Sequence, residues 1–177
     1  MERVTGELRD SLIAGFRREA LHLEMRDLYA AVDHGRFRKW LAGEPLDAAA
    51  EAEWWRPWRE MMRGHRAAGR ALRRLRVVSE PVTDYIRFEW RDADELVRVG
   101  EDVRWLPRQR ASSLLLPGND LWSFDAETVV FTHLAGDGVV QGYELTRDPA
   151  LVAQCVAAFE AAWRAAIPHS DFTPSRP

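Results

Sequence analysis

The residues whose types and spacing could do chemistry flank the ends of two predicted strands. They are Glu80, Asp84, Tyr85, Arg104 and Arg108. Loops at strand ends line the ligand crevice of α/β sheets, so these side chains could form one polar pocket. A hydrolase or nuclease would use Glu80, Asp84 and Arg108 of this group. The favoured alternative is that Asp84 caps a turn and the arginines form surface salt bridges, because charged residues at strand ends are common.

Other catalytic and metal-binding signatures are absent from the sequence. Its five histidines form no HxH, HxxxH or HExxH pair, and a single cysteine excludes a thiolate zinc cage. It contains no GxSxG motif, no phosphate-binding glycine loop and no GxGxxG motif. We therefore expect no metal site, no cofactor and no catalytic residue.

A second candidate surface is an arginine stripe in the stretch from Trp54 to Arg76. Its members recur at three- and four-residue steps: Arg56, Arg59, Arg63, Arg66, Arg70 and Arg73. On a helix these positions fall within a stripe about 100° wide. Residues 56–76 hold eight arginines against one glutamate, a charge of +7, so the rest of the −3 chain carries −10. One of Trp54 and Trp55 must also point away from the core, and it is a candidate contact residue.

The arginine stripe has several interpretations. The leading one is a solvated face that pairs with the acidic remainder of the same chain. Another is contact with an acidic protein partner, for which the binding candidates are Arg59, Arg63, Arg66, Arg70 and Arg73. Direct DNA binding is less favoured, because the acidic remainder opposes approach to phosphates. A membrane surface is least favoured, because the opposite helix face is needed for the core.

Hydrophobic periodicity and capping residues predict the elements of the N-terminal half. These are a helix over 8–18 capped by Thr5, a strand over 21–25, a helix capped by Asp33 and ended by Gly43, and the long basic helix capped by Asp47. Pro57 is tolerated only in a first turn, so the regular basic helix is expected to begin near Trp55. A strand over 75–78 and a helix from Thr83 to about Val99 follow, although residues 86–90 also alternate like a strand.

The C-terminal half predicts strands and one helix. The strands cover 103–106, 121–124, 128–134 and 139–145, the last three forming a β-meander, and Asp148-Pro149 starts a closing helix. The order predicts an α/β (α+β) fold, with a mixed β-sheet, a C-terminal β-meander, flanking helices and the long basic helix in the N-terminal half. We expect one globular domain over 1–168 and a flexible tail over 169–177.

The sequence also predicts a cytoplasmic protein. Its N-terminus lacks the apolar core of a signal peptide, and no run approaches the ~18 apolar residues of a membrane span. The single cysteine, Cys155, cannot form an internal disulfide, which fits a reducing compartment.

Several segments together resemble the DUF6879 family, an actinobacterial domain family of unknown function. The matching segments are HLEMRDLY (22–29), FRKWLAGEP (37–45), RVVSEPVTDYIRFEW (76–90), EDVRWLPR (101–108) and LWSFD (121–125). The resemblance implies a regulatory or interaction role and supplies no catalytic residue. The C-terminal part also faintly resembles phospholipase-D-type sensory domains, without the HxK signature of the enzymes. We therefore expect a non-enzymatic regulatory or interaction protein that binds an acidic partner through the basic helix.

Overall fold

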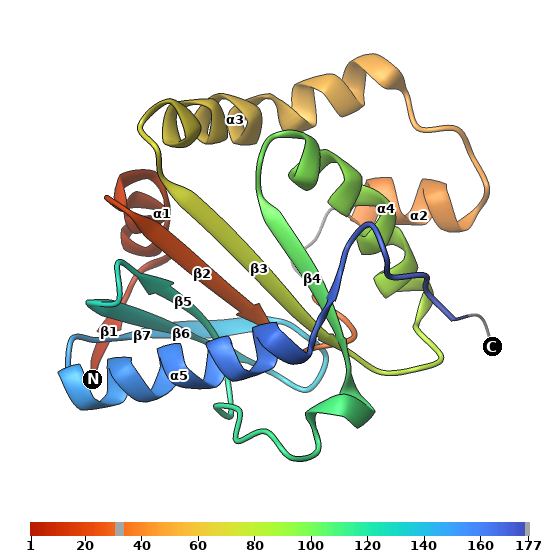
Figure 1. Ribbon diagram of the computed structural model, residues 1–177. Helices are drawn as coiled ribbons and strands as arrows, with labels where there is room; N and C mark the ends of the chain where they lie inside the picture. Colours follow the sequence, from red (N-terminus) through yellow and green to blue (C-terminus); the bar gives the residue numbers. More distant parts are fainter. Residues whose placement is uncertain (31–33, 176–177) are drawn as a thin grey trace.

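An eight-stranded mixed sheet organises the computed structural model, which describes residues 1–30 and 34–175 (Figure 1). Its strands are β1 (Glu2–Val4), β2 (Glu19–Glu24), β3 (Ala71–Val78), β4 (Asp102–Pro107), β5 (Asp120–Phe124), β6 (Thr128–Leu134), β7 (Val140–Thr146) and β8 (Ile167–Pro168). The spatial order is β1-β7-β6-β5-β2-β3-β4-β8. Neighbours β2, β3 and β4 are parallel, and the other neighbours are antiparallel. The predicted mixed α+β class and the β5–β7 meander are confirmed.

The helices begin at capping residues that the sequence predicts. They are α1 (Gly6–Gly15), α2 (His34–Leu41), α3 (Ala48–Ala67), α4 (Asp84–Arg98) and α5 (Pro149–Ala165). In α1, α3, α4 and α5, the side chain of Thr5, Asp47, Thr83 or Asp148 accepts the backbone N–H three residues later. The predicted Asp33 cap lies outside the described residues.

Helices cover both faces of the sheet, because side chains of each strand alternate between the two faces. On one face, α5 buries Phe159 and Trp163 against Leu23 and Leu75 of the central strands. On the opposite face, α1, α3 and α4 form the covering layer, with Met62 of α3 fully buried. Figure 1 shows α3 and α5 on opposite sides of the strands. The central parallel strands are therefore enclosed on both faces.

The structure corrects the predicted extent of the basic helix. α3 begins directly after Asp47 and contains Pro57 within its length, where proline removes one backbone hydrogen bond without ending the helix. The helix ends at Ala67, and Gly69, with a φ of +68°, turns the chain into β3. Arg70 therefore lies in the turn and Arg73 lies on the sheet. The arginine stripe is not one continuous helical face.

The segment expected to be a flexible tail is packed where it is described. His169 and Phe172 are buried, and Phe172 stacks on Trp105 with ring centroids 5.3 Å apart. Trp105 Nε1 donates to His169 Nδ1 at 3.0 Å, and Trp90 Nε1 donates to the Phe172 carbonyl at 3.1 Å. His169 and Phe172 of the segment expected to be a flexible tail therefore pack against the core beside β4 and α4.

Candidate functional site

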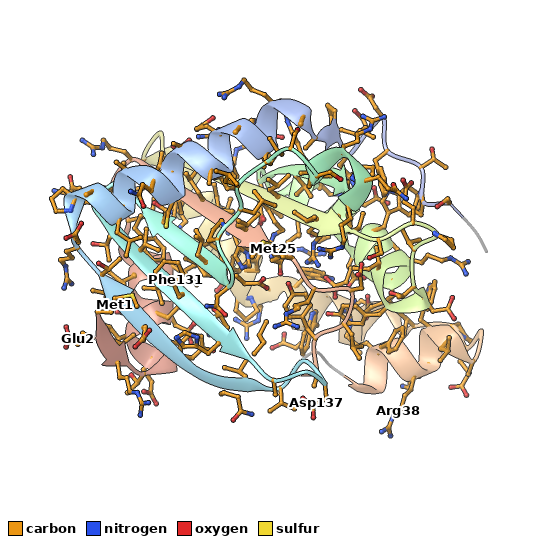
Figure 2. The ribbon with its side chains drawn as sticks, turned by 90° about the horizontal axis from the view of Figure 1, so that it is seen from below. Met1, Glu2, Met25, Arg38, Phe131 and Asp137 are labelled. Carbon is orange, nitrogen blue, oxygen red and sulfur yellow. The ribbon has the colours of Figure 1, made fainter. Side chains whose placement is uncertain are left out.

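A cavity of about 740 Å³ lies at the edge of the sheet where the parallel strands β2 and β4 end. Residues 25–28 after β2, Arg108 after β4, and the turn between β6 and β7 line it. Figure 2 labels Met25 beside the end of β2 and Asp137 at the tip of the β6–β7 hairpin. The Ala30 N–H donates to the Gly138 carbonyl at 3.1 Å, which fastens this hairpin tip to the segment after β2. This is the edge at which α/β sheets usually bind ligands.

Arg108 joins three strand ends at this cavity. Its Nη2 donates to the Met25 carbonyl at 2.7 Å, and its Nε donates to Ser79 Oγ at 3.1 Å. Asp27 accepts from the Ser79 N–H at 2.8 Å and lies 3.4 Å from Arg108 Nη2. Most donors of Arg108 are therefore used within the chain. Its principal role is to hold the loops together.

Asp120 lines the same cavity, and Tyr29, which lies behind it outside the cavity lining, is its hydrogen-bond partner. Tyr29 O–H donates to one Asp120 carboxylate oxygen, and the Met25 N–H donates to the other at 3.0 Å. Burial raises the pKa of Asp120 to about 6 and raises the pKa of Tyr29 above its ordinary value. A carboxyl group with this pKa can take up or release a proton near neutral pH.

The structure separates most residues of the predicted polar pocket. Only Arg108 of the predicted set lines the cavity at the strand ends. Asp84 is exposed and pairs with Arg87 at 3.0 Å, one turn away on α4. Tyr85 is buried on the α3 and α4 side of the sheet. Arg104 packs over the Trp163 ring of α5 at 4.4 Å, on the opposite face.

Glu80, the remaining residue of the predicted polar pocket, is half-buried after β3 and does not line the cavity with Arg108. Of the predicted Glu80, Asp84 and Arg108 constellation, only Arg108 therefore lines this cavity. Two carboxylates that line the cavity, Asp27 and Asp120, were absent from the predicted set. Of these, only Asp120 carried a signal in the sequence, as a carboxylate at the start of a predicted strand.

The predicted arginine stripe is partly neutralised within the chain. Arg59 pairs with Glu95 of α4, and Arg73 pairs with Glu19 at 2.8 Å and with Glu160 of α5. Arg56, outside the binding candidates, pairs with two glutamates of its own helix. Self-neutralisation therefore accounts for part of the stripe.

The remaining three candidates have no carboxylate within ion-pair distance among residues 1–30 and 34–175. Arg63 and Arg66 are exposed on the last turns of α3, and Arg70 Nη1 lies 3.5 Å from His65 Nδ1. The stem of Arg66 lies against Gly100, which has a φ of +99° and no Cβ to obstruct it. We call Arg63, Arg66 and Arg70 the unpaired cluster.

A groove of about 620 Å³ lies between the ends of α3 and α4 and is lined by Arg63 and Arg66 of the unpaired cluster. Its charged lining residues are Arg59, Arg63, Arg66, Glu95 and Arg98. Glu95 contacts both Arg59 and Arg98. Its single negative charge offsets only one of the four positive charges that line the groove. The groove is therefore electropositive and suited to a carboxylate or phosphate group.

An ion-pair network that the sequence does not predict lies between the sheet and the layer of α3 and α4. Arg74 on β3 contacts Glu101 and lies 3.1 Å from Glu24 on β2. Arg76 lies 3.1 Å from Glu24 and 2.6 Å from Glu89 of α4. Both arginines, Glu24 and Glu101 are buried. Buried charges are tolerated only when paired in this way.

Acid should weaken the fold through Glu24. Burial alone would raise its pKa, but Arg76, His22 and Arg74 outweigh burial and lower the pKa from 4.5 to about 2. The ionised group therefore contributes stability above pH 4.5 that is lost as the pH falls toward 2, on the order of 3 kcal/mol. We expect the stability difference between wild type and Glu24→Gln to shrink over that range in urea unfolding.

The exposed Glu44→Gln variant serves as the control for this pH series. Its free energy of unfolding should follow that of the wild type within about 0.5 kcal/mol at each pH. A Glu24→Gln variant whose deficit stays constant from neutral pH to pH 2 would contradict the assignment.

Metal binding and membrane insertion are two other classes of function to which the structure is relevant. Among residues 1–30 and 34–175, no group of three or more His, Cys, Asp or Glu side chains is arranged to hold a metal ion. In the same residues, no helix combines the length and the apolar character needed to cross a membrane.

Comparison with known proteins shows a shared fold and a family. The sequence matches none of the curated proteins. The structure is similar to that of a phospholipase D family member, Nuc from Salmonella typhimurium, with a TM-score of 0.52 and 9% identity over 92% of this chain and 88% of that one. At this identity, the likeness shows the fold alone. The family described as "Domain of unknown function (DUF6879)" matches residues 7–174. Because this match covers nearly the whole sequence, the chain belongs to the DUF6879 family.

Proposed function

We propose that this chain is a non-enzymatic, cytoplasmic regulatory protein that binds an acidic segment of a partner protein through the unpaired cluster. The observation that carries the proposal is that Arg63, Arg66 and Arg70 lack carboxylate partners among the described residues and that Arg63 and Arg66 line an electropositive groove. Other arginines of the stripe have internal partners. Three guanidinium groups at one helix end can each bind a carboxylate through two hydrogen bonds.

An acidic protein segment fits this surface better than DNA does. The chain outside residues 56–76 carries −10, and this net charge disfavours the approach of a long polyanion. A short acidic segment can contact the unpaired cluster while leaving the acidic surfaces in solvent. Separation of Glu80, Asp84 and Arg108 likewise supports binding over the alternative of a hydrolase or nuclease.

A charge-reversal experiment tests the proposal. The variant Arg63→Glu/Arg66→Glu/Arg70→Glu is expected to bind a fluorescein-labelled oligo-glutamate peptide at least about tenfold more weakly than wild type in fluorescence anisotropy. The reason is that each exposed ion pair contributes about 0.2–1 kcal/mol, and each reversal also adds repulsion. Far-UV circular dichroism should confirm that the variant is folded.

The matched control reverses three exposed arginines elsewhere, Arg110, Arg147 and Arg164, and so changes the net charge equally. Peptide binding should be weakened much less in this control. Equal losses in both variants would contradict a specific site. Binding of a labelled duplex DNA but not of the peptide would replace the proposal with direct DNA binding, and no binding of the peptide by wild type would also overturn it.

A further inference from the structure

A second cavity, of about 460 Å³, lies between the sheet and helices α3 and α4, away from the unpaired cluster. Its walls include Trp54, Trp55 and Trp58 of α3 and Tyr85 of α4. We call it the tryptophan chamber. From its lining we infer that it binds a neutral, planar heteroaromatic molecule of the nucleobase class, a role separate from the proposed partner binding.

The walls provide stacking surfaces. Trp54 lines the chamber and is 49% exposed. Of Trp54 and Trp55, it is therefore the one that points away from the core. The Arg36 guanidinium lies 5.2 Å from the Trp54 ring and 5.5 Å from the Trp55 ring, which fixes these rings from one side. Nucleobases stack on such rings regardless of sequence, because every base has a π-face.

The charged lining of the tryptophan chamber consists of three ion pairs. Arg36 lies 2.7 Å from Asp92, Arg74 lies 3.1 Å from Glu24, and Arg76 lies 2.6 Å from Glu89. All six residues line the chamber, and their charges cancel. A net charge on the ligand would therefore gain no counter-ion.

Adjacent guanidinium and carboxylate groups offer donors and acceptors side by side. The edge of a nucleobase also carries hydrogen-bond acceptors and donors side by side. Its acceptor atoms can pair with an arginine, and its amino group can donate to a carboxylate. A plain hydrocarbon ring would form no hydrogen bond with these groups and would gain only the stacking contacts. The polar lining therefore selects a heteroaromatic ring over an apolar one.

Trp58 provides an independent observation at the same place. The residue lines the chamber, and its indole nitrogen is buried without a hydrogen-bond acceptor among the described residues. Buried donors of this kind are normally paired with protein, water or ligand. An acceptor atom on a bound heteroaromatic ring would pair with this donor.

Isothermal titration calorimetry with adenosine, to roughly 5 mM, tests the inference in the millimolar affinity range. We expect saturable binding of adenosine and no saturable binding of benzyl alcohol, which has a ring without a hydrogen-bonding edge. Adenosine monophosphate should bind no more tightly than adenosine. Absence of adenosine, cytidine and uridine binding would overturn the inference, and tighter binding of the monophosphate would overturn the assignment of a neutral ligand.

Variants locate the binding. Trp54→Ala is expected to weaken adenosine binding about 5- to 150-fold, the range reported by stacking substitutions, whereas Trp54→Phe keeps a ring and should lose less. Because Trp54 is half exposed, its removal should leave the fold intact. Leu115→Ala, at a 94% exposed site outside the chamber, is the matched control and should bind like wild type. Unchanged binding in Trp54→Ala would place the ligand elsewhere.

The indole N–H resonance of Trp58 supplies a second readout. In ¹H–¹⁵N spectra, this peak can be assigned by its loss in Trp58→Phe. We expect it to shift during adenosine titration with the same dissociation constant as the calorimetric signal, because its donor gains an acceptor. A Trp58 peak that stays in place while adenosine binds would contradict the proposed pose.

Discussion

Replacing Arg74 with methionine is expected to lower the free energy of unfolding by about 3–5 kcal/mol. Arg74 is 8% exposed and contacts Glu101, which is 2% exposed. Methionine leaves the buried Glu101 carboxylate without an ion-pair partner among the described residues, and an unpaired buried charge is strongly destabilising. Urea unfolding at neutral pH measures the loss.

A double variant separates the unpaired charge from lost packing. Arg74→Met/Glu101→Leu removes both charges and should recover most of the stability that the single variant loses, because apolar residues of similar volume replace buried ion pairs well. The exposed Arg110→Met variant is the control and should change stability by less than about 0.5 kcal/mol. A single Arg74→Met variant as stable as wild type would contradict the structural role of the pair.

The pH dependence of the Arg74→Met variant provides a further check. Burial already raises the pKa of Glu101 in the wild type, and removal of Arg74 takes away an interaction that lowers it. A folded-state pKa above the unfolded one means that stability falls as the pH rises through the folded pKa. The deficit of the variant should therefore shrink when the pH is lowered enough to protonate Glu101.

The boundary between α3 and β3 shows why the arginine-rich stretch was difficult to predict. Arginines at three- and four-residue steps continue from α3 into Arg70 and Arg73, so helical periodicity alone extends the helix. Pairing of β3 with β2 and β4 decides otherwise, and such pairing depends on distant segments. The local signal that could have ended the helix is Gly69, whose positive φ is typical of a helix C-terminus.

The position of the cavity at the strand ends was predictable from the sequence, but most of the residues that line it were not. A sheet with parallel central strands predicts a crevice at their carboxyl ends, and Arg108 lies there as expected. Its partner Asp27 comes from the loop after β2, and Asp120 comes from the start of β5; the β6–β7 hairpin tip fastens this loop at Ala30. Sequence spacing contains no information about that contact.

The buried ion-pair network was missed for a related reason. Arg74 and Arg76 alternate with Leu75 and Val77, a pattern typical of a strand with one face in solvent. The structure instead covers the charged face with α3 and α4 and pairs each arginine with glutamates from other elements. Whether a charged strand face is buried depends on which helices cover it, and that arrangement is tertiary.

Substituting Phe172 with alanine is expected to destabilise the protein by about 3–5 kcal/mol, the usual cost of removing a buried phenylalanine. Phe172 is 3% exposed and stacks on the fully buried Trp105 at an interplanar angle of 10°. Its loss would leave a cavity beside Trp105, and the surrounding chain can close such a cavity only in part. Thermal and urea unfolding measure the effect.

The neighbouring exposed residue supplies the control for this substitution. Asp171→Ala changes the same segment without opening the core and should alter stability by less than about 0.5 kcal/mol. If residues 169–175 were instead a free tail in solution, Phe172→Ala and Asp171→Ala would be equally harmless. A large loss for Phe172→Ala alone is therefore the result that distinguishes a packed segment, anchored by His169 against Trp105, from a mobile one.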